Sequence, residues 1–344
     1  MAVLNPLADL DGHRVSVEVP ATSANLGAGY DTLALALEMV NRVTVESIVR
    51  PSAGTEAAVG ARDGEGDDGA AGLPAIELTV DGDGQGELPA DRSNAFVVAL
   101  ERGVAEARGL PADACAGIGW RIAMQNRIPL SRGLGSSAAA TVAGLLAGSA
   151  LAGSPLGPDR LLALATELEG HPDNAAAACL GGFTIAAHGD APVAVRFDAP
   201  RDLRTILFIP ETRLATRDMR AVLPASVPLR DAVANLQAVG LGVAGLATGR
   251  TEYLRFLTVD RLHEPYRAAV YPQLPTLVEA ARAAGALGAC LSGAGSTIIA
   301  FADSLGMIAR VEAAFRACSA DLGFPGRTET VPPRNLGARL LALG

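Results

Sequence analysis

A glycine- and serine-rich loop has the clearest chemical character in the sequence. The segment PLSRGLGSSAAA, residues 129–140, precedes a run rich in alanine and leucine, as in a loop that leads into a helix N-terminus. Free backbone N–H groups and the positive end of the helix dipole favour anions there, and glycine lets the backbone approach a ligand closely. Phosphate is the anion that we expect. The alternative at this point is a tight turn with a serine N-cap.

The cationic side chains narrow the class of phosphate site. All 28 Lys and Arg residues are arginine, so the chain contains no lysine. A Walker A loop needs a lysine at the nucleotide phosphates, and a pyridoxal enzyme needs one for its Schiff base. Both classes are therefore excluded.

The elements around the loop indicate an α+β fold. Alternating hydrophobic and polar residues predict strands in RVSVEVPA and RVTVESIV, and the apolar segment 33–39 between them is a third candidate. GWRIAMQNRIP predicts a strand that enters the loop, and 136–152 predicts a buried helix. Further helices are expected in AFVVALERGVAEARG, in PDRLLALATELEG and just after it. Strands and helices that do not alternate regularly favour α+β over a doubly wound sheet.

A domain boundary is expected near residue 200, where RTILFIP begins a new unit. We therefore predict an N-terminal domain over 1–198 and a C-terminal domain over 199–344. Residues 51–74 combine glycine, alanine and acidic residues with almost no large apolar group, and we predict a disordered acidic insertion there.

Composition excludes several partners and compartments. The net charge is -9, but nine acidic residues lie in 63–91, a stretch without arginine, so the rest is balanced. No basic stripe or aromatic platform for nucleic acid is present. The uncharged run 133–158 is interrupted by glycines and rich in alanine, which favours a buried helix over a membrane span. The four cysteines are far apart, and the N-terminus lacks the basic region of a secretory signal, so we expect a cytoplasmic protein.

Two more glycine-bearing segments, PATSANLGAGYDTLALAL at 20–37 and LSGAGSTI at 291–298, accompany the loop at 129–140. In their order along the chain and in their residues, the three segments resemble the motifs of the GHMP kinases, small-molecule kinases with a phosphate loop that is not a Walker A motif. EGHPDNAAAACLGGF at 169–183 resembles the homoserine kinases within that family. Two departures are present: the first motif has Ala28 and Tyr30 where the family has Pro and Phe, and the third has Ser296 for Pro.

The resemblance implies a fold and a nucleotide site. The N-terminal domain is expected to be like the second domain of ribosomal protein S5, the C-terminal domain to be ferredoxin-like, and the active site to lie between them. The loop is expected to wrap the phosphates of ATP, and Asn94 to lie near adenine, although a plain N-cap is equally open for Asn94. The expected ATP-binding residues are Asn94, Pro129, Leu130, Ser131, Arg132, Gly133, Leu134, Gly135, Ser136, Ser137, Ala138, Ala139, Gly293 and Gly295.

The resemblance also implies a Mg²⁺ site. Ser136 or Ser137 is expected to offer a hydroxyl to the ion, and a carboxylate is expected from TELEG. Glu167 and Glu169 are two residues apart, so on a helix they point about 200° apart and only one can face the metal. The choice between these two remains open.

Substrate residues follow from the resemblance and from charge. A carboxylate is best met by the planar fork of arginine. Arg220 and Arg267 are expected to bind the α-carboxylate of an amino acid, Asn25 and Asp31 its amino and hydroxyl end, and His171 to make a further contact with the substrate. The other histidines, His13, His188 and His263, are assigned structural roles.

Catalysis is expected to depend on alignment, because phosphoryl transfer has a loose transition state that does not require a strong base. Either Asp173 or Asn174 is expected to face the acceptor hydroxyl, and Thr216 to orient the acceptor.

The resulting expectation is ATP-dependent phosphorylation of L-homoserine to O-phospho-L-homoserine, a step of threonine biosynthesis. The alternatives are another GHMP kinase, for example of the mevalonate type, and a catalytically silent ligand sensor of the same fold. The resemblance further implies a homodimer. Feedback inhibition by threonine and the role of the acidic insertion stay open.

Overall fold

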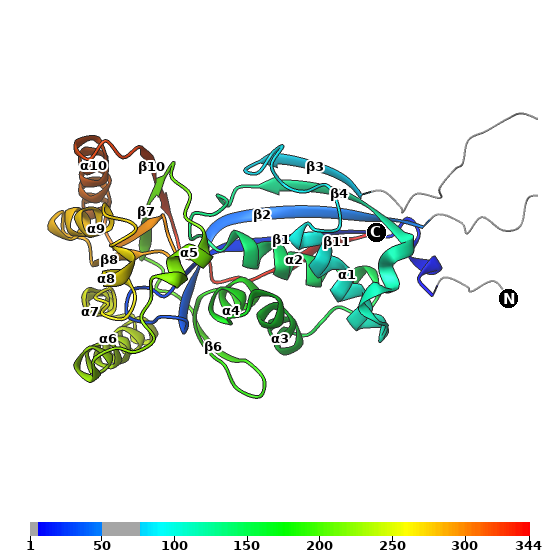
Figure 1. The fold of residues 1–344 in the computed structure, drawn as a ribbon, viewed down its shortest axis with the longest axis horizontal. Coiled ribbons are helices and arrows are strands. Elements are labelled where there is room, and N and C mark those ends of the chain that lie inside the picture. The colour runs from blue at the N-terminus through cyan, green and yellow to red at the C-terminus, as the bar shows by residue number, and fades with distance from the viewer. Residues whose placement is uncertain (1–5, 50–75) are drawn as a thin grey trace, which may run out of the picture.

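Two β-sheets organise the chain in the computed structural model, which describes residues 6–49 and 76–344. The acidic insertion expected at 51–74 lies outside the described residues. Figure 1 shows the larger sheet and the smaller sheet side by side along the long axis of the molecule. Strands and helices are mixed without regular alternation, which confirms the predicted α+β class.

The larger sheet has the order β11-β1-β2-β4-β3, and β5 pairs with both β2 and β6. All pairs are antiparallel except β3 with β4, which is parallel. The strands are β1 (Arg14–Ala24), β2 (Leu33–Val49), β3 (Ile76–Gly82), β4 (Ile118–Asn126), β5 (Phe183–Ala187), β6 (Val193–Phe197) and β11 (Arg339–Leu343). The two strands expected on either side of residue 40 are one continuous strand, β2, which is long enough to pair with β4 at one end and β5 at the other.

The smaller sheet has the order β10-β7-β9-β8 and is antiparallel throughout. Its strands are β7 (Arg204–Pro210), β8 (Gly288–Leu291), β9 (Ile298–Ala302) and β10 (Gly326–Val331). The chain then returns to the larger sheet, where β11 pairs with β1. Arg334 and Arg339 anchor this return by ion pairs with the buried Glu18 of β1.

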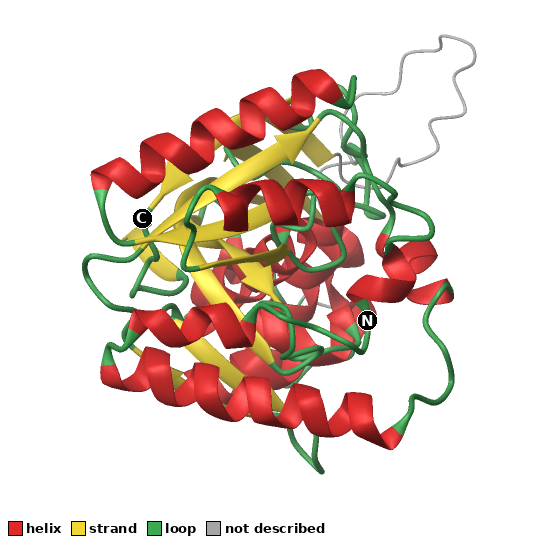
Figure 2. Cartoon of the chain, turned by 90° about the vertical axis from the view of Figure 1, so that its left-hand side faces the viewer, coloured by secondary structure: helices red, strands yellow, loops and turns green. Residues whose placement is uncertain are grey.

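Helices cover one face of each sheet, as Figures 1 and 2 show. Helices α1 to α4 lie on the larger sheet, α9 and α10 pack on the smaller one, α5 lies at the junction, and α6 to α8 lie at the end of the molecule that holds the smaller sheet. The helices are α1 (Ala95–Arg108), α2 (Ser136–Leu151), α3 (Pro158–Glu169), α4 (Asp173–Leu180), α5 (Thr216–Ala221), α6 (Leu229–Thr248), α7 (Leu254–Leu257), α8 (Glu264–Arg267), α9 (Leu274–Ala283) and α10 (Leu305–Asp321); the short 3-10 helices are Ala8–Leu10, Ala112–Gly117 and Thr251–Tyr253.

The uncharged run of the sequence forms α2. This helix contacts α1, α3, α4 and β1, and nearly every side chain from Ala138 to Leu151 is buried. A helix surrounded by protein in this way excludes charge for the same reason that a core does. Within the described part of the chain, no helix is both long and apolar enough to cross a membrane.

Candidate functional site

A cavity of about 620 Å³ opens where the three glycine-bearing segments meet. It gathers most of the residues that the sequence predicted, from both ends of the chain. The predicted residues that line it are Asn25, Asp31, Asn94, Leu130, Ser131, Arg132, Gly133, Leu134, Gly135, Ser136, Ser137, Ala138, Ala139, Glu169, His171, Asp173, Asn174, Thr216, Arg220, Arg267 and Gly293. Pro129, Glu167 and Gly295 are not among its lining residues.

Backbone hydrogen bonds fasten the three segments to one another. Thr22 N–H donates to the carbonyl of Leu134 (3.1 Å), and Gly293 N–H donates to that of Ala24 (3.1 Å). Thr297 N–H donates to the carbonyl of Arg132 (3.0 Å). The floor of the cavity is therefore held by contacts between residues that are more than a hundred positions apart in the sequence.

Two glycines of the loop allow this close packing. Gly133 and Gly135 have φ of 72° and 69°, in the left-handed region that favours glycine. A Cβ at Gly133 would lie 2.1 Å from the carbonyl oxygen of Ser292, and one at Gly135 would lie 1.9 Å from Thr22 Oγ1. The glycine pattern is thus explained by the approach of two other segments to the loop.

The N-terminus of α2 faces the cavity without a side-chain cap. The residue at its N-cap position is Gly135, and no side chain accepts a hydrogen bond there. The serine N-cap considered as an alternative is therefore wrong. The first-turn N–H groups of α2 have no helical partner, so they are available to an anion in the cavity.

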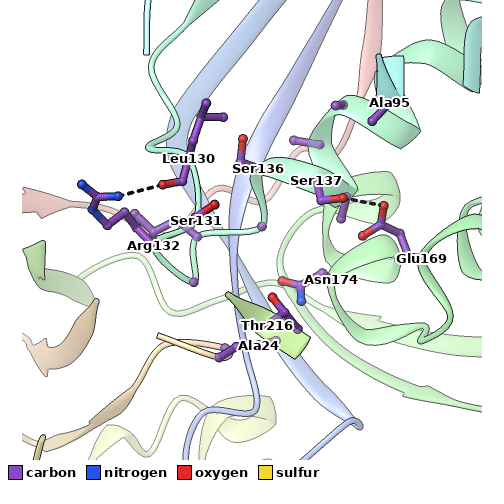
Figure 3. A pocket seen from close by; sticks show the side chains of 18 of the residues that line it. Ala24, Ala95, Leu130, Ser131, Arg132, Ser136, Ser137, Glu169, Asn174 and Thr216 are labelled. Carbon is purple, nitrogen blue, oxygen red and sulfur yellow. Dashed lines mark hydrogen bonds between the residues drawn. The ribbon is translucent and has the colours of Figure 1, made fainter. Parts of the chain in front are cut away.

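The structure distinguishes Glu167 from Glu169, the two candidates for the carboxylate of the Mg²⁺ site. Glu169 Oε1 accepts hydrogen bonds from Ser137 Oγ (2.9 Å) and Thr141 Oγ1 (2.7 Å), and Figure 3 shows the Ser137–Glu169 contact beside the loop. The side chain of Glu167 is 62% exposed and lies near Arg102 instead. Hydroxyl and carboxylate oxygens are the donors that Mg²⁺ prefers, so the pair Ser137 and Glu169 fits this ion. Ser136 also lines the cavity.

Two of the residues predicted to bind ATP, Arg132 and Asn94, make hydrogen bonds within the protein. The guanidinium of Arg132 donates to the carbonyls of Leu130, Pro210 and Glu211, so it joins the loop to the end of β7. Figure 3 shows it turned to the opposite side of the loop from Ser137. Asn94 caps α1 through the N–H of Phe96 (3.0 Å) while also lining the cavity, so both of its predicted roles are compatible with its position.

Arg220 and Asp31 form a two-point ion pair at the cavity wall. Arg220 Nη1 and Nη2 donate to the two oxygens of Asp31 at 2.9 and 2.6 Å. Nη1 also donates to the hydroxyl of Tyr30 at 2.9 Å. The side chains of Arg220 and Asp31 are 35% and 30% exposed, so each can still meet a ligand.

Arg267 is a buried cation. The residue is 1% exposed, yet it lines the cavity. Its guanidinium donates to the carbonyls of Met219 (3.2 Å) and Gly293 (3.0 Å) and to His263 Nδ1 (2.9 Å), all of them neutral acceptors. Among the described residues, no carboxylate lies within ion-pair distance of it. Asn25 shares the Gly293 carbonyl, to which its Nδ2 donates at 2.9 Å.

A group of polar side chains from the start of α4 completes the wall. His171 Nδ1 lies 3.2 Å from Asp173 Oδ1, close enough for an ion pair though not aligned for a hydrogen bond, and this carboxylate raises the pKa of His171. Asp173 also accepts from the N–H of Asn174 (2.7 Å). Thr22 Oγ1 donates to Asn174 Oδ1 (2.6 Å), which directs the amide group. Thr216, the first residue of α5, lies nearby in Figure 3.

Three residues of the site were missed or given another role by sequence reasoning. Thr22 and Tyr30 lie inside the first glycine-bearing segment, where only Asn25 and Asp31 were singled out. His263 was assigned a structural role, but it contacts Arg267. Its spacing of four residues before Arg267 was a signal, because residues at i and i+4 are neighbours on a helical turn.

Comparisons with known proteins identify the family of the chain. The models of the N-terminal and C-terminal domains of GHMP kinases match residues 94–182 and 250–321. A homoserine kinase of Moorella thermoacetica is 38% identical, over 94% of this chain and 98% of its own. One of Corynebacterium efficiens is also 38% identical, over 93% and 97%.

Solved structures give the same result. The crystal structure of a homoserine kinase from Cytophaga hutchinsonii is similar with a TM-score of 0.77 and 28% identity, covering 95% of this chain and 97% of that one. A mevalonate kinase from L. major has a TM-score of 0.59 at 17% identity, which reflects a shared fold only. The predicted GHMP kinase fold is confirmed. On these matches and on its site, the chain belongs to the homoserine kinase family of the GHMP kinases.

Proposed function

We propose that this chain transfers the γ-phosphoryl group of ATP to the side-chain hydroxyl of L-homoserine and so forms O-phospho-L-homoserine. The observation that carries the substrate assignment is Arg267, a buried guanidinium that lines the cavity with only neutral acceptors around it. A buried cation with no carboxylate at ion-pair distance is unfavourable, and a carboxylate in the cavity relieves that cost. Homoserine brings such a carboxylate.

The neighbouring ion pair supports an amino acid rather than a simple acid. Arg220 and Asp31 present a positive and a negative group side by side at the wall. A zwitterion matches this pair, with its α-carboxylate towards Arg220 and Arg267 and its α-amino group towards Asp31. Asn25 donates to Gly293 and accepts from Asp31 N–H, so it steadies the loop that carries Asp31.

The nucleotide site is proposed to consist of residues 130–139 and the first turn of α2, with the adenine towards Asn94. The backbone N–H groups of this turn would hold the phosphates. Ser137 and Glu169 would hold Mg²⁺, which when bound neutralises phosphate charge and orients the phosphates for transfer. The chain's own contribution is then to hold both substrates in line.

The acceptor hydroxyl is proposed to lie near Asn174 and Thr216. Thr22 Oγ1 donates to the amide oxygen of Asn174, and one hydrogen of the amide nitrogen points to Asp173 Oδ1 at 3.5 Å, so the second hydrogen can be donated to an acceptor oxygen. Asp173 is 2% exposed and is occupied by His171 and by a backbone N–H, so we assign it to positioning rather than to proton abstraction. A strong base is not needed for this reaction.

Replacement of each arginine by lysine tests the substrate assignment. Arg220→Lys and Arg267→Lys keep the positive charge but lose the planar guanidinium, which can donate two parallel hydrogen bonds to a carboxylate. Each is expected to raise the KM for homoserine on the order of tenfold to a hundredfold, which corresponds to a loss of roughly 1.5 to 3 kcal/mol of binding free energy. The KM for ATP should hardly change. Arg217→Lys is a matched control on the same helix, because that side chain is 92% exposed. An unchanged homoserine KM in both variants would refute the assignment.

We also propose that the chain acts as a homodimer in the cytoplasm, as the family resemblance implies. Sedimentation velocity of the purified protein at micromolar concentration should give a single species of twice the chain mass. A monomer over the whole concentration range would exclude the dimer.

A further inference from the structure

A buried histidine lies directly behind the substrate arginine. His263 is 0% exposed and immediately precedes α8. Its Nδ1 is 2.9 Å from Arg267 Nη1, and its Nε2 is 2.8 Å from the carbonyl oxygen of Gly27. A guanidinium only donates hydrogen bonds, so Nδ1 must carry a lone pair. The proton is then on Nε2, which donates to Gly27, and one neutral tautomer satisfies both contacts.

The surroundings keep this ring neutral. Burial lowers the pKa of His263 to about 4. The carboxylate of Asp260 lies 3.7 Å from Nε2, but it accepts hydrogen bonds from the N–H groups of Leu262, His263 and Glu264 and from Asn235 Nδ2. A protonated ring would also turn a donor towards Arg267, where the geometry requires an acceptor.

The histidine connects Arg267 to the loop that carries Asp31. Gly27 belongs to the turn between β1 and β2, and Asp31 lies four residues further along the same turn. The ring of Tyr30 in this turn lies 5.2 Å from the His263 ring and 5.5 Å from the guanidinium carbon of Arg267. His263 therefore connects Arg267 with the turn that carries Asp31, two parts of the cavity wall that are far apart in the sequence.

We propose that His263 is a positioning residue for substrate binding: it orients the guanidinium of Arg267 into the cavity and fixes it relative to the loop of Asp31. The inference rests on the proposed role of Arg267 as the carboxylate ligand. Arg267 has no ion pair to orient it, so its direction depends on the hydrogen bonds to His263 and to two backbone carbonyls and on the ring of Tyr30. Loss of the acceptor at Nδ1 leaves a guanidinium N–H unpaired and lets the fork rotate away from the substrate.

Two substitutions separate the two hydrogen bonds of the ring. In His263→Asn the amide oxygen takes roughly the place of Nδ1 and keeps the acceptor for Arg267. In His263→Gln the amide nitrogen takes roughly the place of Nε2 and keeps only the donor to Gly27. The glutamine variant is expected to raise the KM for homoserine on the order of tenfold to a hundredfold, with an ATP KM within about twofold of wild type. The asparagine variant should stay within about threefold of wild type for both substrates.

A merely structural histidine predicts a different result. Both variants would then lower the melting temperature with no selective change in the homoserine KM, and this outcome overturns the proposal. A larger homoserine KM for the asparagine variant than for the glutamine variant overturns it as well. If Arg267→Lys alone leaves the homoserine KM unchanged, the carboxylate assignment itself has failed. If Arg267→Lys raises it while His263→Gln does not, only the role of His263 is refuted.

The double variant and the tautomer give independent tests. His263→Gln is expected to add less than about threefold to the homoserine KM of Arg267→Lys, because the histidine acts through the arginine. If the homoserine KM of the double variant rises by the product of the two single effects, the histidine does not act through the arginine, and the proposal is contradicted. If the glutamine variant does not fold, ¹⁵N NMR of wild-type protein labelled at histidine provides the answer, with the His263 signal assigned from His263→Asn. The neutral Nε2–H tautomer is expected at pH 7, and an Nδ1–H or doubly protonated ring overturns the proposal.

Discussion

Glu169→Gln is the sharpest perturbation of the proposed metal site. A glutamine can place its amide oxygen where Oε1 now accepts from Ser137 and Thr141, so both hydrogen bonds can be kept while the charge is lost. Two opposite unit charges about 4 Å apart interact by roughly 4 kcal/mol at an effective dielectric constant of about 20. Loss of a large part of that interaction predicts a fall in kcat on the order of a hundredfold to a thousandfold, or an equivalent rise in the Mg²⁺ requirement.

Glu167→Gln is the matched control, since it makes the same chemical change two residues earlier. Its side chain is 62% exposed and its contact with Arg102 is 3.7 Å, a surface pair of little energetic weight. We expect kcat within about twofold of wild type. A coupled ADP-release assay over a range of Mg²⁺ concentrations measures both variants, and thermal unfolding without ligand checks that each is folded.

The reasoning is refuted if the two glutamine variants show equal and mild effects. It is also refuted if Glu169→Gln loses activity only in proportion to a lower melting temperature, because the carboxylate would then support the loop rather than the metal.

Three further predictions follow from the substrate side of the cavity. Tyr30→Phe removes the hydroxyl that accepts from Arg220 and is expected to raise the homoserine KM by about twofold to fivefold while the ATP KM stays constant. Asp31→Asn removes the charge that is proposed to meet the α-amino group of the substrate, so the preference for homoserine over the deamino analogue 4-hydroxybutyrate should fall at least about tenfold. Asp173 raises the pKa of His171 above 6.5. The contribution of the His171–Asp173 pair to folding stability is therefore fully present below pH 6.5 and is lost as the pH rises through the raised pKa. The melting temperature of His171→Gln should therefore differ from wild type more near pH 5.5 than near pH 9; an equal difference at both contradicts the pairing.

Local sequence patterns predicted the elements well where a periodicity or a glycine-rich turn was present. The strand β4, the loop and helix α2 follow one another as expected, because a hydrophobic alternation and an uncharged alanine run are local signals. Strand β3 was not predicted, although Ile76, Leu78 and Val80 alternate with polar residues. It directly follows the acidic segment, whose composition predicts disorder rather than a strand.

Contacts between distant segments could not be predicted from the residues alone. The pairing of β11 with β1 joins positions more than three hundred residues apart, and no local pattern encodes such a register. The same holds for Arg220 with Asp31 and for the choice of Glu169 over Glu167. Helical spacing showed only that the two glutamates diverge, whereas the packing of α3 against α2 decides which one meets Ser137.

The most direct test of the account is an acceptor panel with the purified wild-type protein. ATP and Mg²⁺ are supplied with L-homoserine, with mevalonate, with 4-hydroxybutyrate or with no acceptor; ADP release is followed, and ³¹P NMR identifies the product. We predict rapid ADP release with L-homoserine only, and a phosphate monoester on its side-chain oxygen. Faster turnover of mevalonate, or ligand binding without ADP release from any acceptor, would contradict the account.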